Sequence, residues 1–148
     1  MLRKTTLGAL CATLVGCASS GRIGELPAVA DGAASSQLVL IRSGSLIGAT
    51  NSYYVSLDGK DVFSIRSGEN TSFRVPLGEH TVSVKCFGGS SPTWKEDGKQ
   101  FVAAADQSNY FQISPNMTCA KIEPIDADSG KKLLASSKYV DPKTVSSK

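Results

Sequence analysis

The sequence predicts a mainly β fold: an antiparallel β-sandwich of seven or eight short strands with a short C-terminal helix. From residue 37 onward, short apolar runs are separated by turn-forming residues, as in all-β domains. The apolar positions are mostly β-branched or aromatic, which suits a pleated surface. The composition is globular, with 41% hydrophobic and 20% charged residues, and a length of 148 residues fits one domain.

A hairpin is the clearest element of this sandwich. A continuous apolar run at residues 38–41 predicts a buried strand before it. Residues 53–57 then alternate between apolar and polar side chains, and Asp58-Gly59 is a typical two-residue hairpin turn. Residues 62–65 begin the returning strand, so the two runs are expected to pair.

The later strands are shorter and more scattered. Apolar runs predict them at residues 73–75, 82–86, 101–105, 110–113 and 117–122. Turn-like segments at 106–109 and 114–116 separate the last three. Residues 82–86 alternate cleanly, which places Cys86 on the inward face.

The chain after the strands predicts one helix and a tail. Residues 129–139 fit a short helix with Leu133 and Leu134 on its apolar face and Asp128 as its N-cap. Residues 141–148 are expected to form a loose tail. The sandwich domain itself is therefore expected to span residues 37–140.

The N-terminus has the pattern of a bacterial lipoprotein signal peptide. Arg3 and Lys4 precede a short apolar stretch at residues 7–15, which is too short to span a membrane. Residues 14–17, Leu-Val-Gly-Cys, resemble a lipobox, in which a small residue precedes the cysteine that receives the lipid. The alternatives are an ordinary cleavage site and an N-terminal helix with an incidental cysteine. The expectation is that residues 1–16 are removed.

Lipidation of Cys17 would anchor the mature protein to a membrane, since several acyl chains give stable attachment. The following residues are Ala18 and Ser19, whereas an Asp would resemble an inner-membrane retention signal. The resemblance thus implies the outer membrane, with the domain facing the periplasm. Residues 17–36 are small and polar and are expected to be a flexible tether, with a root-mean-square span of about 25 Å.

Charge and composition argue against several function classes. The chain has a formal net charge of +3, but loss of Arg3 and Lys4 leaves 14 cations against 13 anions. A nucleic-acid partner is therefore not expected. A single histidine, His80, also gives no expectation of a metal site or a cofactor.

The four cysteines divide by position. Cys11 leaves with the signal peptide and Cys17 carries the lipid, so Cys86 and Cys119 remain for an oxidising compartment. An even remainder predicts one disulfide, closing about 33 residues; two free thiols are the alternative. A cysteine metal site lacks further ligands, because the sequence has no CxxC motif.

The stretch from Leu38 to Val84 resembles a family of small bacterial lipoproteins known as domain of unknown function 2846. The matching motifs are the entry at residues 41–48, the hairpin at 55–60 and the Pro-Leu-Gly-Glu-His turn at 76–80. Ser43 and Leu77 stand where the family usually has Pro. The turns are also similar to those of the regulatory domains of carboxypeptidases. The resemblance implies a β-sandwich lipoprotein and no activity.

Two side chains are candidates for function. His80 is either a ligand or proton relay, or a residue whose ring nitrogens hydrogen-bond the turn backbone. Trp94 lies in residues 88–98, a stretch rich in Gly, Ser and Pro that predicts a long loop. Its ring either contacts a partner or glycan, or folds back to cap the core.

Other polar patterns have simpler interpretations. Residues 126–130 faintly resemble a calcium loop, but helix capping explains them better because Lys131 and Lys132 follow directly. Arg42 and Arg66 are expected to be solvated strand ends. The serines of the strands have no general base in a recognisable motif, and no glycine-rich phosphate loop follows a strand.

These observations predict a non-enzymatic, lipid-anchored protein of the cell envelope that acts through interactions or as an assembly accessory. An envelope protein or a glycan is the expected partner, in addition to the membrane. The alternative function is a periplasmic inhibitor or glycan-binding module acting on cell-wall material. An envelope hydrolase would need acid and base residues brought together from distant parts of the sequence.

Overall fold

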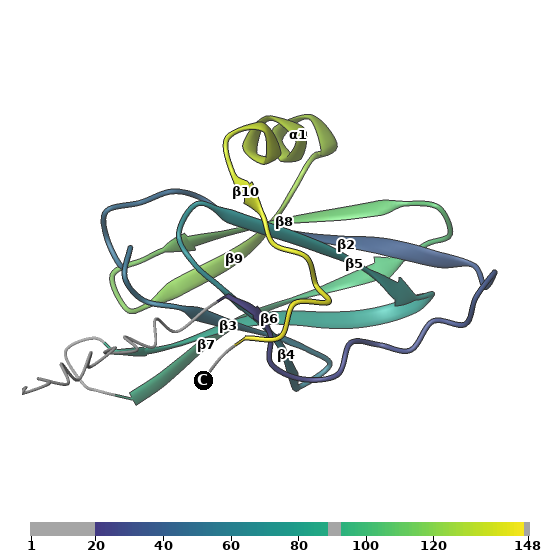
Figure 1. The fold of residues 1–148 in the computed structure, drawn as a ribbon, viewed down its shortest axis with the longest axis horizontal. Helices are drawn as coiled ribbons and strands as arrows, with labels where there is room; N and C mark the ends of the chain where they lie inside the picture. The colour runs from purple at the N-terminus through teal and green to yellow at the C-terminus, as the bar shows by residue number, and fades with distance from the viewer. Residues whose placement is uncertain (1–19, 89–92, 147–148) are drawn as a thin grey trace, which may run out of the picture.

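Two five-stranded sheets pack face to face, and one short helix lies outside them (Figure 1). The structure is a computed structural model that describes residues 20–88 and 93–146. The β-sandwich and its C-terminal helix confirm the predicted fold class. Among the described residues, eight strands have five or more residues, and two further strands have two residues each.

The first sheet is antiparallel throughout. Its strands, in spatial order, are β1 (Gly21–Arg22), β4 (Lys60–Ile65), β3 (Tyr53–Leu57), β6 (Gly78–Gly88) and β7 (Thr93–Ala103). The β3–β4 hairpin turns at Asp58-Gly59, where both residues have positive φ, as this turn type requires. The predicted hairpin is therefore confirmed.

The second sheet is mixed rather than purely antiparallel. Its strands are β10 (Lys138–Tyr139), β5 (Glu69–Pro76), β2 (Ser35–Arg42), β8 (Ser108–Pro115) and β9 (Ala120–Ile125). β2 runs parallel to β8, and β10 runs parallel to β5. The parallel β2–β8 pair joins strands separated by the whole of the first sheet's β3, β4, β6 and β7, which local patterns do not reveal.

The core lies between the two sheets. Both sheets contribute buried β-branched and aromatic side chains from alternate positions, as expected for a sandwich. The largest fully buried apolar residues are Phe63, Phe111, Leu38, Leu40, Ile41, Ile65, Ile113 and Ile122.

The β6–β7 hairpin is longer than the sequence predicted. Its strands pair from Gly78 with Ala103 to Gly88 with Thr93. Trp94 therefore lies on a strand, and the predicted loop over residues 88–98 is wrong for 93–98. Residues 93–100 read TWKEDGKQ and face mostly outward, so their polarity hid a strand that is held by pairing with β6.

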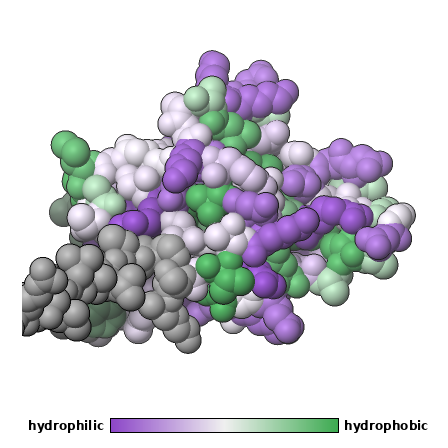
Figure 2. All heavy atoms as spheres, viewed as in Figure 1, coloured by the Kyte–Doolittle hydropathy of each residue, from purple (hydrophilic) through white to green (hydrophobic). Residues whose placement is uncertain are grey.

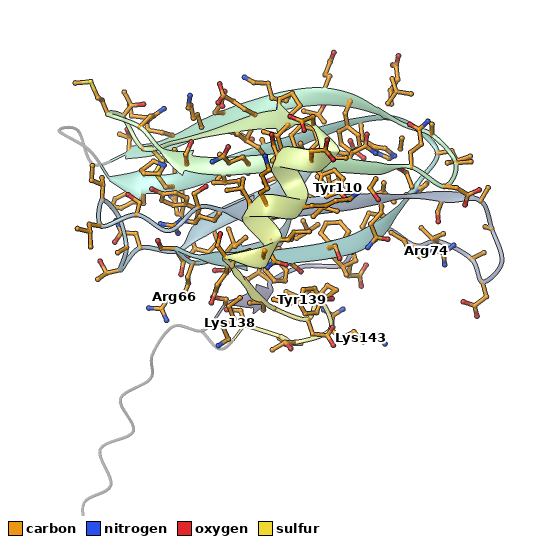
Figure 3. All side chains as sticks on the ribbon, turned by 90° about the horizontal axis from the view of Figure 1, so that it is seen from above. Arg66, Arg74, Tyr110, Lys138, Tyr139 and Lys143 are labelled. Atoms are coloured by element: carbon orange, nitrogen blue, oxygen red, sulfur yellow. A yellow bond between two sulfur atoms is a disulfide. The ribbon has the colours of Figure 1, made fainter. Side chains whose placement is uncertain are left out.

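The helix α1 spans Ala127–Ala135 and lies on the outer side of the second sheet (Figures 1 and 3). Its N-cap is Asp126, which accepts a hydrogen bond from the Ser129 backbone N–H at 2.9 Å. The predicted cap, Asp128, lies instead in the first turn. Gly130 packs on the ring of Tyr110, where a Cβ would lie 2.4 Å from a ring carbon.

The segments expected to be a tether and a tail are both attached to the fold. β1 pairs with β4, and Leu26 packs against the core. The C-terminal segment reaches the same place, because the Arg22 N–H donates to the Thr144 carbonyl at 2.7 Å and the Ser146 N–H donates to Arg22 at 2.9 Å. The folded unit thus extends beyond residues 37–140, to include at least residues 20–26 and 144–146.

Candidate functional site

The two ends of the sandwich have different surfaces. The first, called here the apolar end, is formed by the loop at residues 43–52 after β2, the paired ends of β6 and β7 at residues 86–88 and 93–95, and the loop at 116–119 between β8 and β9. β2 and β8 run parallel and finish there, and β6 finishes beside the start of β3. The second, the His80 end, carries the β3–β4 turn and the β5–β6 turn (Figure 1).

A buried arginine organises the apolar end. The Arg42 side chain comes from the last residue of β2 and is only 1% exposed. Its guanidinium donates to three backbone carbonyls: Asn51 at 2.6 Å, Ile65 at 2.9 Å and Gly48 at 2.7 Å. It also lies 3.5 Å from the centre of the Tyr53 ring, a cation–π contact. The cation thus fixes the loop at 43–52 to the end of β4.

The expectation that Arg42 is a solvated strand end is therefore wrong. Burial lowers the pKa of Arg42 below its ordinary value, against the opposing effects of Tyr53 and Glu69. An arginine nevertheless stays charged at neutral pH. A charge buried without a carboxylate contact is stabilised by hydrogen bonds that replace its hydration. The three carbonyls provide these bonds to Nη1 and Nη2, whereas the buried Nε has no hydrogen-bond partner among the described residues.

The loop that Arg42 holds exposes two large apolar side chains. Leu46 is 97% exposed and Ile47 is 72% exposed. The backbone beneath them is ordered, because the Ser45 N–H donates to the Ser67 hydroxyl at 2.9 Å and the Ala49 N–H to the Leu46 carbonyl at 3.4 Å. Figure 2 shows hydrophobic side chains projecting at the left edge, over this loop.

A cysteine pair ties the two sheets together at the same end. Cys86 on β6 and Cys119 before β9 have Cα atoms 6.0 Å apart, which is the separation of a disulfide. The Tyr53 hydroxyl donates to the Cys119 carbonyl at 3.2 Å. Asn116 accepts hydrogen bonds from the backbone of its own loop, at 2.6 Å from the Cys119 N–H. This ordered loop holds Met117 fully in solvent.

Aromatic rings form a cluster on the outer face of the first sheet, next to the apolar end. Trp94 meets Tyr54 at 5.5 Å and Phe87 at 5.6 Å between ring centres, both edge to face. Trp94 is 58% exposed, so it does not cap the core. A hollow of about 350 Å³ lies beside it, lined by Trp94 and the charged residues Asp61, Lys85, Lys95 and Glu96.

The single histidine joins the two turns of the opposite end. His80 Nδ1 lies 2.7 Å from an Asp58 carboxylate oxygen, and Nε2 lies 2.8 Å from the Pro76 carbonyl. Asp58 also accepts from the Thr81 N–H at 2.9 Å. A carbonyl only accepts hydrogen bonds, so Nε2 carries a proton, and Nδ1 also donates when the ring is protonated. Both nitrogens are thus engaged within the fold, and one bonds the turn backbone.

The pKa of His80 is raised above its ordinary value. Burial opposes the charge, but the hydrogen bonds to Asp58 and Pro76 outweigh it. The pKa of Asp58 is lowered: burial again opposes the charge, and the bonds from Thr81 and His80 prevail. The pair lines a hollow of about 360 Å³ with Phe101 and Val102.

At residues 126–128, Asp126 caps the helix and Asp128 lies in its first turn. Asp126 bonds both the Ser129 N–H and, at 2.7 Å, the Ser129 hydroxyl. Within the described parts of the chain, no three histidine, cysteine or acidic residues are grouped so as to hold a metal ion.

Sequence patterns missed most of the apolar end. They gave the cysteine pair and Trp94, but not Arg42, Leu46 or Ile47. The strand prediction placed Met117 inside a strand, whereas it lies in a loop. Cys17, the expected lipidation site, lies outside the described residues.

The chain matches no family model, no curated protein and no solved structure. No helix among residues 20–88 and 93–146 is both long and apolar enough to cross a membrane.

Proposed function

We propose that this chain is a lipid-anchored protein of the bacterial cell envelope that acts by binding. The observation that carries the binding role is the aromatic cluster of Trp94, Tyr54 and Phe87 on a paired sheet, in which Trp94 and Phe87 are exposed. Rings already packed against one another lose little conformational freedom when a partner covers them, so they make efficient contacts.

The sequence supports the anchor. The Leu-Val-Gly-Cys motif at residues 14–17 follows a basic and then an apolar segment, and the resemblance to domain of unknown function 2846 implies a lipoprotein. A cysteine pair at disulfide distance suits an exported protein. On this proposal the protein sits on the outer membrane and faces the periplasm.

The bonding of the single histidine supports a non-enzymatic role. The only histidine of the sequence bonds Asp58 and Pro76 through its two ring nitrogens. A general base needs a free nitrogen directed at a substrate. The proposal therefore assigns this pair to holding the turns, with no catalytic step.

A glycan-binding or inhibitory role is the second candidate. The hollow beside Trp94 combines an aromatic ring with carboxylates and ammonium groups from Asp61, Lys85, Lys95 and Glu96. Ring faces and hydrogen-bonding groups together are the chemistry that recognises sugars. This candidate predicts quenching or enhancement of Trp94 fluorescence by cell-wall glycan fragments.

The anchor is tested by the mass of the mature protein isolated from membranes. We expect an N-terminus at Cys17 carrying acyl chains, and no acylation and no membrane retention for Cys17→Ser. A soluble wild-type protein with an unmodified cysteine would overturn the lipoprotein assignment.

The binding role is tested with Trp94→Ala and the matched control Tyr139→Ala, which removes another half-exposed aromatic residue far from the cluster. Cross-linking in intact cells should capture envelope proteins with the wild type and the control, and lose them with Trp94→Ala. Equal capture by all three would overturn the aromatic cluster as the contact. Fluorescence changes with glycan fragments alone would favour the second candidate.

A further inference from the structure

We infer that the apolar end rests on the lipid bilayer, with Leu46, Ile47 and Met117 entering the membrane surface. This inference depends on the proposed lipid anchor at Cys17 and adds the orientation of the domain. It assigns phospholipid as the partner that covers the exposed apolar side chains.

The position of β1 shows at which end of the sandwich the N-terminal chain enters the fold. Gly21 pairs with Ser64, Ser64 with Tyr54, and Tyr54 with Lys85, so these four residues lie at one level along the sandwich. β1 runs antiparallel to β4, and β4 runs toward the apolar end. The chain before Gly21 therefore enters the fold from the apolar end.

The length of chain before β1 carries the second step. Cys17 precedes Gly21 by four residues, which span at most about 14 Å when fully extended. Phe87 lies two residues beyond Lys85 toward the apolar end, or roughly 7 Å along the strand. A lipidated Cys17 can thus reach the level of Phe87 and only about 7 Å beyond it. The sandwich cannot stand far from the membrane, in contrast to the span expected of a 20-residue tether.

The exposed side chains at this end supply the third step. Leu46, Ile47 and Met117 extend from ordered loops at 97%, 72% and essentially full exposure. Transfer of such side chains from water to the acyl boundary is favourable. Phe87 and Trp94 follow just behind, where aromatic rings favour the membrane interface.

Charge at the margin of this end agrees with a lipid surface. Arg66 follows β4, and the Lys138 N–H donates to the Gly68 carbonyl at 2.8 Å in the turn after it. Figure 3 shows both side chains along one edge of the fold. In the described chain, neither forms an ion pair within 4 Å, although Glu69 lies beside them. Two such cations are suited to anionic headgroups.

The test measures the depth of each end in the intact, lipidated protein. Trp94 is the only tryptophan of the sequence, so Trp94→Phe provides a silent background. In that background, Leu46→Trp reports the apolar end and Leu77→Trp reports the His80 end, where Leu77 is also partly exposed. The probes are vesicles of phosphatidylethanolamine and phosphatidylglycerol with bromine at defined acyl carbons.

We expect strong quenching and a blue shift for the tryptophan at 46, and less than a tenth of that quenching at 77. Equal quenching at both positions, or quenching only at 77, would overturn the orientation. Absence of quenching at both, in protein that still floats with the vesicles, would overturn membrane contact and leave the anchor intact. In that outcome, protection of residue 46 by a co-purifying protein would identify a protein as the occupant.

The mass of each sample separates this inference from the proposed function. Protein that lacks acyl chains on Cys17 and stays in solution would overturn the anchor, and the orientation with it. As a second variant, Leu46→Asp with Ile47→Asp keeps the wild-type Trp94 and the anchor. We expect it to float with vesicles as before and to lose at least half of the Trp94 quenching by shallow bromines.

Discussion

The apolar end and the His80 end of one sandwich are stabilised by opposite means. At the apolar end, a buried cation, a cysteine pair and ordered loops hold a frame whose outermost side chains are hydrophobic. At the His80 end, a partly exposed histidine–aspartate pair joins two turns. An exposed loop with no binding role would not need such a frame. The difference therefore indicates that the apolar end is held in place so that it presents Leu46, Ile47 and Met117.

The largest difference between the ends should come from Arg42. Arg42→Met leaves the carbonyls of Gly48, Asn51 and Ile65 without their donor, and we expect the free energy of unfolding to fall by about 3–5 kcal/mol. Urea unfolding measures it. Arg66→Met is the matched control and should change stability by about 0.5 kcal/mol or less. Equal effects of the two variants would show that the buried Arg42 cation does not stabilise the apolar end.

The second-largest effect on stability is expected from the cysteine pair. Replacement of Cys86 and Cys119 by alanine is expected to cost about 3–4 kcal/mol, since the bond would close a loop of 33 residues in the unfolded chain. Urea unfolding with and without reductant checks this. The wild type should lose that stability on reduction, and the double variant should be indifferent to reductant. A wild type unaffected by reductant would mean that the thiols are not bonded.

The His80 end should depend on pH and contribute less. The raised pKa of His80 means that its stabilisation is full below the ordinary value of 6.5 and is lost as pH rises through the higher folded value. For Asp58, the stabilisation is present above pH 3.8, its ordinary pKa, and is lost as the pH falls through the lower pKa of the folded state. The pair is therefore strongest between about pH 4 and pH 6.5.

Comparison of the wild type with His80→Gln tests this. We expect a difference of no more than about 1 kcal/mol at pH 5.5, because Asp58 is half-exposed, and a smaller one at pH 9. A difference that grew with pH would contradict the assigned protonation.

The smallest effect on folding is expected from the loop tip. Leu46→Asp changes an exposed side chain, so unfolding should shift by about 0.5 kcal/mol or less, as with the control Leu77→Asp at the other end. Both variants keep the anchor and should float with vesicles, but quenching of Trp94 by brominated lipids should fall in Leu46→Asp and stay unchanged in Leu77→Asp. A large loss of stability in Leu46→Asp would mean that the side chain packs within the fold.

Much of the fold could be predicted because half-buried strands alternate in sequence. The β3–β4 hairpin followed from residues 53–65, and Cys86 from the alternation of residues 82–86. The first half of β7 could not be predicted, because TWKEDGKQ faces solvent and is held as a strand by its pairing with β6. Local polarity carries no information about such pairing.

The candidate site was harder to predict for a related reason. Arg42 reads as a strand end, and only the return of residues 48–51 over its side chain buries it. Leu46 and Ile47 resemble any short apolar run, and their exposure depends on that same loop. The attached N-terminal segment was also hidden, because small polar residues at 18–36 give no sign of the pairing of β1 with β4.

Hydrogen–deuterium exchange of the lipidated protein, on vesicles and in the Cys17→Ser form in solution, tests the central claim most directly. If the apolar end lies on the membrane, amides in the loops at 43–52 and 116–119 exchange more slowly on vesicles, and those at the turns near Asp58 and Leu77 do not change. Protection confined to the turns of the His80 end, or no protection at either end, would contradict the account.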